Sequence, residues 1–209
     1  MTDNELTALH RQLAELQSRV TQLEAEVETG PPRDRAWTRG YYLTYYATAG
    51  FFLGMIAAVS SLLFNVVGAL SVGEHPLQLI RVYLTFGLGS RALDLELDQH
   101  SGLTLIIGCC LYIATGMLLG IIFQLVLSRL ADRASLAKRL VIASMLAILV
   151  WFVNYYLLLS WIQPLLFGGN WIITEIPSWV AVLTHLVFGW TMAALYPLGK
   201  FEPYRVVTE

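Results

Sequence analysis

The sequence predicts an all-α integral membrane protein, in which a four-helix transmembrane bundle follows an N-terminal cytosolic coiled coil. Hydrophobic residues make up 56% of the 209 residues and charged residues only 13%, a balance outside the range of ordinary soluble domains. Nearly all of the charges fall outside four long apolar stretches. Because roughly 20 apolar helical residues cross a hydrocarbon core of about 30 Å, each stretch is long enough to span a membrane.

The first 29 residues are predicted to form the coiled coil. Seven apolar residues recur there at alternating spacings of three and four, the a and d positions of a heptad repeat: Leu6, Leu9, Leu13, Leu16, Val20, Leu23 and Val27. Leucine at d with valine at two a positions favours a parallel two-stranded pair. The alternative is an amphipathic helix that lies on the membrane or on another subunit. This seam is the predicted oligomerisation site.

Residues 30–40 are predicted to be a linker. Gly30, Pro31 and Pro32 follow the heptads, and proline neither continues a helix nor allows helical geometry readily in the residue before it. We therefore expect a hinge between the coiled coil and the first span.

Residues 41–199 are predicted to be the transmembrane domain, with spans at about 41–72, 101–128, 140–166 and 176–199, and residues 200–209 a cytosolic tail. These four stretches contain no Asp, Glu, Lys or Arg. Each also carries small residues three or four positions apart, which let helix backbones approach in lipid, within one chain or between copies. The small residues are Gly50, Gly54 and Ala58, then Gly116 and Gly120, then Ala143 and Ala147, then Gly189 and Ala193.

The basic residues predict the orientation. Eleven of the 13 Lys and Arg residues lie in the N-terminal segment, in the connection between the second and third stretches, or in the tail. Only Arg81 and Arg91 lie in the other two connections, which carry five acids. Since cytoplasmic loops retain positive charge, both termini are expected in the cytoplasm of a multi-pass protein of the plasma (inner) membrane. The first 40 residues contain no apolar segment, so no cleaved signal is expected.

Polar residues within the spans are the candidates for a functional site, because they are costly in lipid. At about 1.5 Å per residue, Asn154, His185 and Cys109 fall at a similar depth, roughly 10 Å from the outer edge. Thr184 adjoins His185, and Asn65 is near the outer end of the first span. We expect an intramembrane polar layer in which Asn154 and His185 join two helices by a hydrogen bond. His185 as a ligand of haem, metal or quinone, or on a proton path, is the alternative.

The first outer connection contains two further candidates. Residues 77–88 suggest a short amphipathic helix in the headgroup layer, with Arg81 reaching towards water, and a re-entrant segment is the alternative. In the stretch that follows, Glu96, Asp98 and His100 alternate with other residues. An extended chain would place them on one face as a weak candidate cation site, although a solvated acidic segment is favoured.

No catalytic motif accompanies these features. The sequence contains no Walker loop, G-x-G-x-x-G, H-E-x-x-H or G-x-S-x-G, so we expect no enzyme activity and no cofactor. The predicted function is a noncatalytic oligomeric or accessory subunit of a membrane assembly, whose partners are the lipid bilayer, further copies or other membrane subunits, and not nucleic acid. The alternatives are an oligomeric ion channel and a haem- or quinone-binding electron-transfer subunit.

Overall fold

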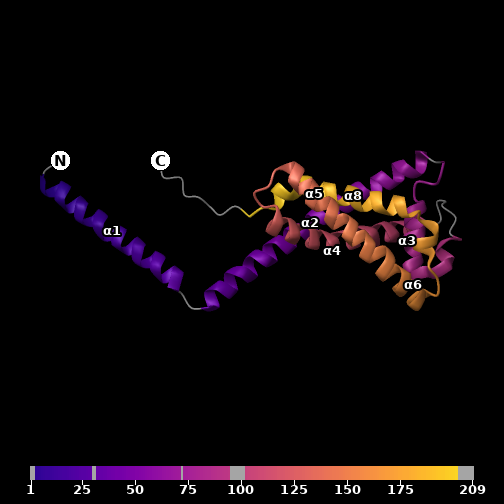
Figure 1. The fold of residues 1–209 in the computed structure, drawn as a ribbon, viewed down its shortest axis with the longest axis horizontal. Helices are drawn as coiled ribbons and strands as arrows, with labels where there is room; N and C mark the ends of the chain where they lie inside the picture. Colours follow the sequence, from indigo (N-terminus) through magenta and orange to yellow (C-terminus); the bar gives the residue numbers. More distant parts are fainter. Residues whose placement is uncertain (1–2, 30–31, 72, 95–101, 202–209) are drawn as a thin grey trace. The chain divides into compact units, whose positions relative to one another are not determined.

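The computed structural model describes residues 3–29, 32–71, 73–94 and 102–201, and all regular structure in these ranges is helical. The chain divides into two compact units, Met1–Tyr42 and Leu43–Glu209. The predicted helical class of the fold is confirmed. Figure 1 shows the elements with the labels used below.

The first unit contains α1 (Asp3–Thr29) and the beginning of α2 (Pro32–Ser71). The helix predicted over the heptads is therefore present. The linker predicted at residues 30–40 differs from the structure, because α2 already begins at Pro32. The fixed φ of proline suits the first position of a helix, where its missing N–H has no helical partner in any case. Pro32 is therefore the first residue of α2.

Within the described residues, four helical segments are long and apolar enough to cross a membrane: Gly40–Ser71, Gly102–Leu130, Leu136–Phe167 and Ser178–Gly199. They coincide within a few residues with the four predicted stretches. The first belongs to α2, the second is α4 (Gly102–Leu130), and the fourth comprises α8 (Ser178–Leu195) and the 3-10 helix η4 (Tyr196–Gly199). The third is continuous but changes its winding, from α5 (Leu136–Phe152) through the π-helix η3 (Val153–Leu159) to α6 (Ser160–Phe167).

Glycines bring α2 and α4 into backbone contact. A Cβ atom added to Gly54 would lie 2.5 Å from the carbonyl oxygen of Gly116 and 2.8 Å from the Cα of Gly120, and one added to Gly50 would lie 2.5 Å from the carbonyl oxygen of Gly120. Any side chain at these positions would force the helices apart. The small residues predicted in these two spans thus pack within one chain.

Small residues also join α5 to α8. A Cβ atom on Gly189 of α8 would lie 3.0 Å from the carbonyl oxygen of Ala143 and 3.1 Å from the Cβ of Ala147. Both alanines are fully buried. Next to these contacts, the main apolar core of the bundle includes Phe123 and Met192.

The short helices α3 (Gln78–Leu88), η1 (Gly89–Ala92), α6 and α7 (Trp171–Glu175) form one end of the bundle, called here the α3 end. The helix predicted at residues 77–88 is present, and Gly89 ends it with a φ of 60°. It differs from the prediction in its surroundings, since Ile80, Val82 and Leu84 are all buried by other elements of the protein. A helix lying alone in headgroups would bury one stripe only. The opposite end, called the η4 end, consists of residues 131–135 and η4.

Candidate functional site

A cavity of about 650 Å³ lies between the helices near the α3 end. All four of the long helical segments contribute to its wall, together with α3 and α7. Most of the lining is apolar, with Leu79 and Phe86 from α3, Leu119 from α4 and Phe188 from α8 among the contributors. Mostly apolar clefts and cavities of this size with a few polar groups are typical of small-molecule sites.

The π-helix η3 forms one side of the cavity. Asn154, Tyr155, Leu158 and Leu159 all come from its seven residues. A π-helix is wider than an α-helix, is rare, and occurs frequently at functional sites. The hydroxyl of Tyr155 donates to the carbonyl oxygens of Ile173 and Ile176, at 3.0 and 2.8 Å. These bonds fix η3 to the segment between the third and fourth spans.

A buried glutamine holds α3 in place over the cavity. Gln163 of α6 is 0% exposed. Its Nε2 donates to the hydroxyl oxygen of Thr85 on α3 at 2.7 Å, and its Oε1 accepts from the backbone N–H of Ile172 on α7 at 3.1 Å. One side chain therefore joins three of the elements at the α3 end.

The hydroxyl groups of the cavity wall use their protons within the protein. Ser61 donates to the carbonyl oxygen of Ala58 at 3.0 Å, so the phenol of Tyr112, 2.8 Å away, donates to Ser61. Thr115 donates to the carbonyl oxygen of Leu111, and the phenol of Tyr83 correspondingly donates to Thr115 at 2.5 Å. Burial raises the pKa of the Tyr83 phenol, which favours this neutral, proton-donating form.

The interhelical hydrogen bond in the polar layer joins α2 to α8. Asn65 Nδ2 lies 2.9 Å from Oγ1 of Thr184, whose hydroxyl also lies 2.8 Å from the carbonyl oxygen of Val180. Asn65 is buried, so the bond forms away from the exterior of the bundle. We predicted a bond between Asn154 and His185, but the structure places this role on Asn65 and Thr184.

His185 lines the cavity and keeps one ring nitrogen as a hydrogen-bond acceptor. Its Nδ1 lies 2.8 Å from the carbonyl oxygen of Ala181. A carbonyl oxygen only accepts, so Nδ1 carries the N–H, and in the neutral ring Nε2 keeps its lone pair. Thr184 precedes His185 on α8, and both residues line the cavity. Within the described residues, no hydrogen bond engages Nε2.

Asn154 supplies the second unengaged polar group of the wall. It lines the cavity from η3, and its side-chain amide makes no hydrogen bond with any residue that the structure describes. An amide of this kind offers two donors and one acceptor. The cavity therefore combines satisfied hydroxyls with two groups that have free hydrogen-bonding capacity.

The structure brings three of the four predicted polar-layer residues to the cavity, namely Asn154, Thr184 and His185. Cys109 is outside its wall. Its side chain is partly buried against a separate apolar cluster that contains Ile80 and Leu105, and the neighbouring Cys110 is exposed. The depth of a residue along a helix does not fix the side of the helix on which it lies.

The predicted cation site cannot be located. Glu96, Asp98 and His100 lie outside the described residues. Among the residues that are described, no group of three or more His, Cys, Asp or Glu side chains could hold a metal ion. His75 is exposed, and its Nδ1 accepts from the backbone N–H of Leu77 at 3.1 Å.

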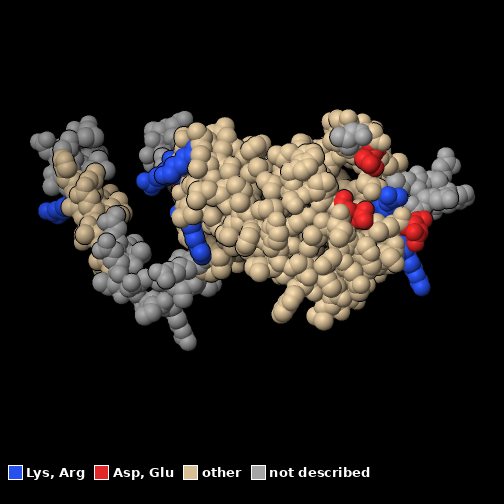
Figure 2. Space-filling view, turned by 45° about the vertical axis from the view of Figure 1, so that its right-hand side comes forward, with Lys and Arg blue, Asp and Glu red and all other residues tan. Residues whose placement is uncertain are grey.

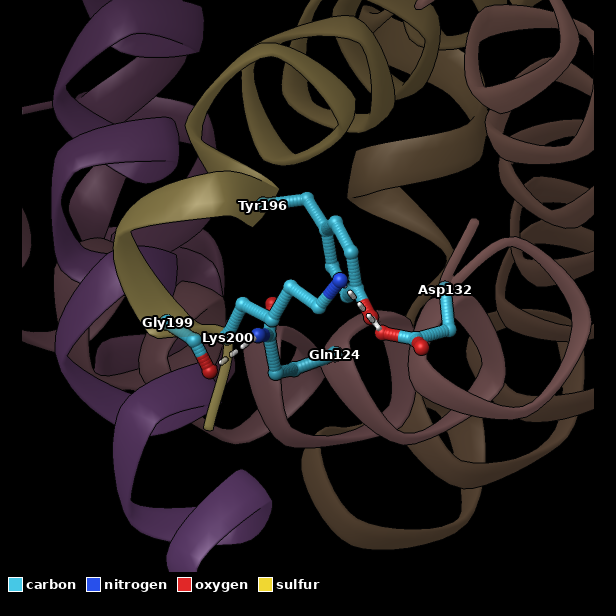
Figure 3. A network of polar contacts seen from close by, with 5 residues as sticks. All are labelled: Gln124, Asp132, Tyr196, Gly199 and Lys200. Atoms are coloured by element: carbon cyan, nitrogen blue, oxygen red, sulfur yellow. Dashed lines mark hydrogen bonds and ion pairs between the residues drawn. The ribbon is translucent and has the colours of Figure 1, made fainter. Parts of the chain in front are cut away.

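A second polar network closes the η4 end, as Figure 3 shows. Gln124 of α4 is fully buried and donates through Nε2 to the carbonyl oxygen of Gly199 at 3.1 Å. The phenol of Tyr196, also fully buried, donates to Asp132 at 2.9 Å, and Lys200 lies 3.5 Å from the same carboxylate oxygen. These contacts hold the end of the fourth span against α4 and the turn that follows it.

The heptad seam is exposed where its side chains are described. Leu13, Leu16 and Val20 of α1 are 56%, 63% and 53% exposed. The side chains of Leu6, Leu9, Leu23 and Val27 lie outside the described set. Within α1, then, three apolar side chains on one face are not covered by the helix itself.

No protein-family model, curated protein or solved structure matches this chain. Among the described residues, the cavity and the exposed seam of α1 are the features suited to contact with other molecules. The first offers a place for a small apolar molecule, and the second offers a place for another helix.

Proposed function

We propose that this protein is a noncatalytic, multi-pass subunit of a membrane assembly, and that α1 joins its copies through a parallel coiled coil on the cytoplasmic side. The observation that carries the proposal is the exposed apolar seam of α1 on a chain whose other unit has an apolar exterior. Removing such a seam from water, by packing it against a second helix, is favourable by roughly 1.5–3 kcal/mol for each leucine-sized side chain.

The exterior of the four long helical segments supports an environment of lipid. Large apolar side chains on all four are more than one third exposed, and many exceed one half, such as Leu63 at 58%, Leu103 at 73% and Met145 at 69%. Soluble monomers rarely expose contiguous apolar patches of more than a few hundred Å². Lipid chains would solvate this exterior, while the backbone groups are paired within the helices.

The distribution of charge supports cytoplasmic termini. Figure 2 shows Lys and Arg gathered at one end of the bundle, and Asp and Glu at the other end beside a few basic side chains. The first end is the η4 end, with Arg133 and Lys138 near the turn between α4 and α5; Glu74 and Glu175 belong to the α3 end. By the positive-inside rule, the η4 end faces the cytoplasm.

Cysteine labelling tests this orientation. Ser135→Cys and Glu175→Cys place a thiol at an exposed residue of the η4 end and the α3 end respectively, in a background with Cys109→Ala and Cys110→Ala. A membrane-impermeant maleimide should label Glu175→Cys in intact cells, and Ser135→Cys only after permeabilisation. Labelling of Ser135→Cys in intact cells would reverse the topology, and labelled protein in the soluble fraction without detergent would refute membrane insertion.

Disruption of the seam tests the assembly. Leu16→Asp introduces a charge at a d position that is 63% exposed in the single chain, and each partner helix would also lose a buried leucine, about 2 kcal/mol. We expect the mass of the detergent-solubilised protein, measured by light scattering, to fall by at least a factor of two. Chains that copurify with the wild type would be identified in the same sample and would show whether the assembly contains other subunits.

Ser18→Asp is the matched control, because Ser18 is two residues away at an f position, on the opposite side of the heptad from the seam. It is also exposed, so its aspartate adds the same charge without entering the predicted interface. Equal masses for the wild type and both variants would contradict assembly through α1, and so would equal loss of mass in both variants.

A further inference from the structure

We infer that the cavity at the α3 end binds a lipid-soluble molecule that carries a hydroxyl group, with Nε2 of His185 accepting the hydroxyl proton and the amide of Asn154 donating to an oxygen of the same molecule. The inference concerns the second unit of the chain and does not depend on assembly through α1.

The balance of donors and acceptors in the wall favours a ligand with a hydroxyl group. The hydroxyls of Ser61, Tyr83, Tyr112, Thr115 and Tyr155 all donate to atoms of the protein. The donor that remains free among these described side chains is the amide of Asn154, and the most basic free acceptor is the lone pair on His185 Nε2; the phenol oxygens also keep lone pairs, which are weaker acceptors. A ligand with a hydrogen-bond donor would pair with the lone pair of His185 Nε2.

His185 is preorganised to accept a hydrogen bond. Its bond to the carbonyl oxygen of Ala181 lies within α8, so it fixes the ring and the tautomer without help from another helix. A ring held in this way presents the same lone pair before and after a ligand binds. The His185 side chain then loses less conformational entropy when a ligand binds.

The apolar character and size of the space also favour such a ligand. A volume of about 650 Å³ is in the range for a small apolar ligand. Leu111 of α4 and Leu158 of η3 line the cavity and are also 48% and 45% exposed. The wall thus includes residues of the apolar surface, from which a molecule dissolved in lipid would approach.

The chemistry shared by suitable ligands is a hydroxyl on an apolar frame. Hydroquinones carry it on an aromatic ring, and sterol-like alcohols carry it on fused aliphatic rings. A carbonyl compound without an O–H, such as the corresponding quinone, offers Nε2 no proton and should bind more weakly.

The experiment measures binding to the full chain in lipid nanodiscs by isothermal titration calorimetry. The probes are 2-decylhydroquinone, its dimethyl ether and cholesterol. The ether has the same carbon frame without the O–H, so we expect it to bind about tenfold more weakly than the hydroquinone, as for one lost buried hydrogen bond. Saturable binding of cholesterol instead of hydroquinone would support the aliphatic class of ligand; no saturable binding of either hydroxylated probe would overturn the inference.

Variants of His185 identify the acceptor. His185→Leu keeps an apolar side chain of similar size, and we expect it to weaken hydroquinone binding about tenfold while leaving the ether unaffected. His185→Gln retains an acceptor oxygen and should restore part of the affinity. Binding of the ether at wild-type strength shows that the cavity is still formed. A hydroquinone affinity unchanged in His185→Leu would overturn the role of this residue.

His75→Leu is the matched control, because His75 is exposed in the connection before α3 and is not among the residues that line the cavity. It should bind both probes as the wild type does. Asn154→Leu tests the second contact separately and should weaken the hydroquinone and the ether alike, since the oxygen that accepts from the amide is present in both. Unchanged affinity for both probes would remove Asn154 from the site.

Discussion

Gly54→Ala should destabilise the helical bundle by about 2–3 kcal/mol, a typical cost of a side chain forced into a closely packed site. The added Cβ would lie 2.5 Å from the carbonyl oxygen of Gly116 and 2.8 Å from the Cα of Gly120. Both are backbone atoms, which cannot turn away as the end of a side chain can. The loss should appear as a lower midpoint of thermal unfolding, followed in detergent by size-exclusion chromatography with fluorescence detection.

Gly68→Ala is the control on the same helix. Gly68 is exposed, and a Cβ there would meet nothing within 4 Å. Alanine is more favourable than glycine in a helix by up to about 1 kcal/mol, so this variant should be as stable as the wild type or slightly more so. If both alanine variants unfolded at the same temperature, α2 and α4 would not approach each other as described.

The second large effect is expected for Gln163→Leu, which removes both hydrogen bonds that join α6 to α3 and α7. The backbone N–H of Ile172 and the hydroxyl oxygen of Thr85 would each lose a buried partner, at about 1–3 kcal/mol for a group left unsatisfied. We expect a total loss of about 2 kcal/mol. Hydrogen exchange of the backbone in α3 and α7 should also become faster, because both helices lose a hydrogen bond that holds them to α6.

Two further variants separate this network from a general effect of the substitution. Gln78→Leu makes the same change at the first residue of α3, where no hydrogen bond of the network is lost, and should be close to neutral. Thr85→Val removes the hydroxyl group that accepts the hydrogen bond from Gln163. If the network is as described, the combined Gln163→Leu and Thr85→Val variant should lose less stability than the sum of the two single variants. Additive losses would indicate that the two side chains act independently.

The positions of the spans were predictable because they depend directly on where the sequence is apolar. Long uncharged stretches have few alternatives to a helix when lipid is the solvent, and the four predicted stretches agree with the four long apolar helical segments within a few residues. The small residues of the first two spans likewise predicted close packing, since a glycine row has no other advantage within a helix.

The cavity was predictable only in part. Counting residues gave Asn154 and His185 the same depth, and both line one space. The same count included Cys109, which lies elsewhere, because rotation about the helix axis depends on packing and not on position along it. The π-helical winding of η3 also left no mark in composition. It depends on bonds such as those of Tyr155 to Ile173 and Ile176, which form only in the folded chain.

The sequence indicated that the two buried glutamines need hydrogen-bond partners. Gln124 and Gln163 are the amides within the second and third apolar stretches besides Asn154, and an amide in such a stretch needs a partner. What the sequence could not supply was the partner itself. Gly199 and Ile172 contribute backbone groups, which any residue type provides, so no pattern of side chains points to them.

The seven π-helical residues of η3 form a wider turn than an α-helix does, and a wider turn accommodates about one extra residue. Loss of one residue between Val153 and Leu159 would let the segment return to ordinary α-helical winding, and Gln163 would stay on the side that faces Thr85. The wall formed by Asn154 would be narrower. Related sequences that lack one residue here should therefore keep the fold of the bundle but have a smaller cavity.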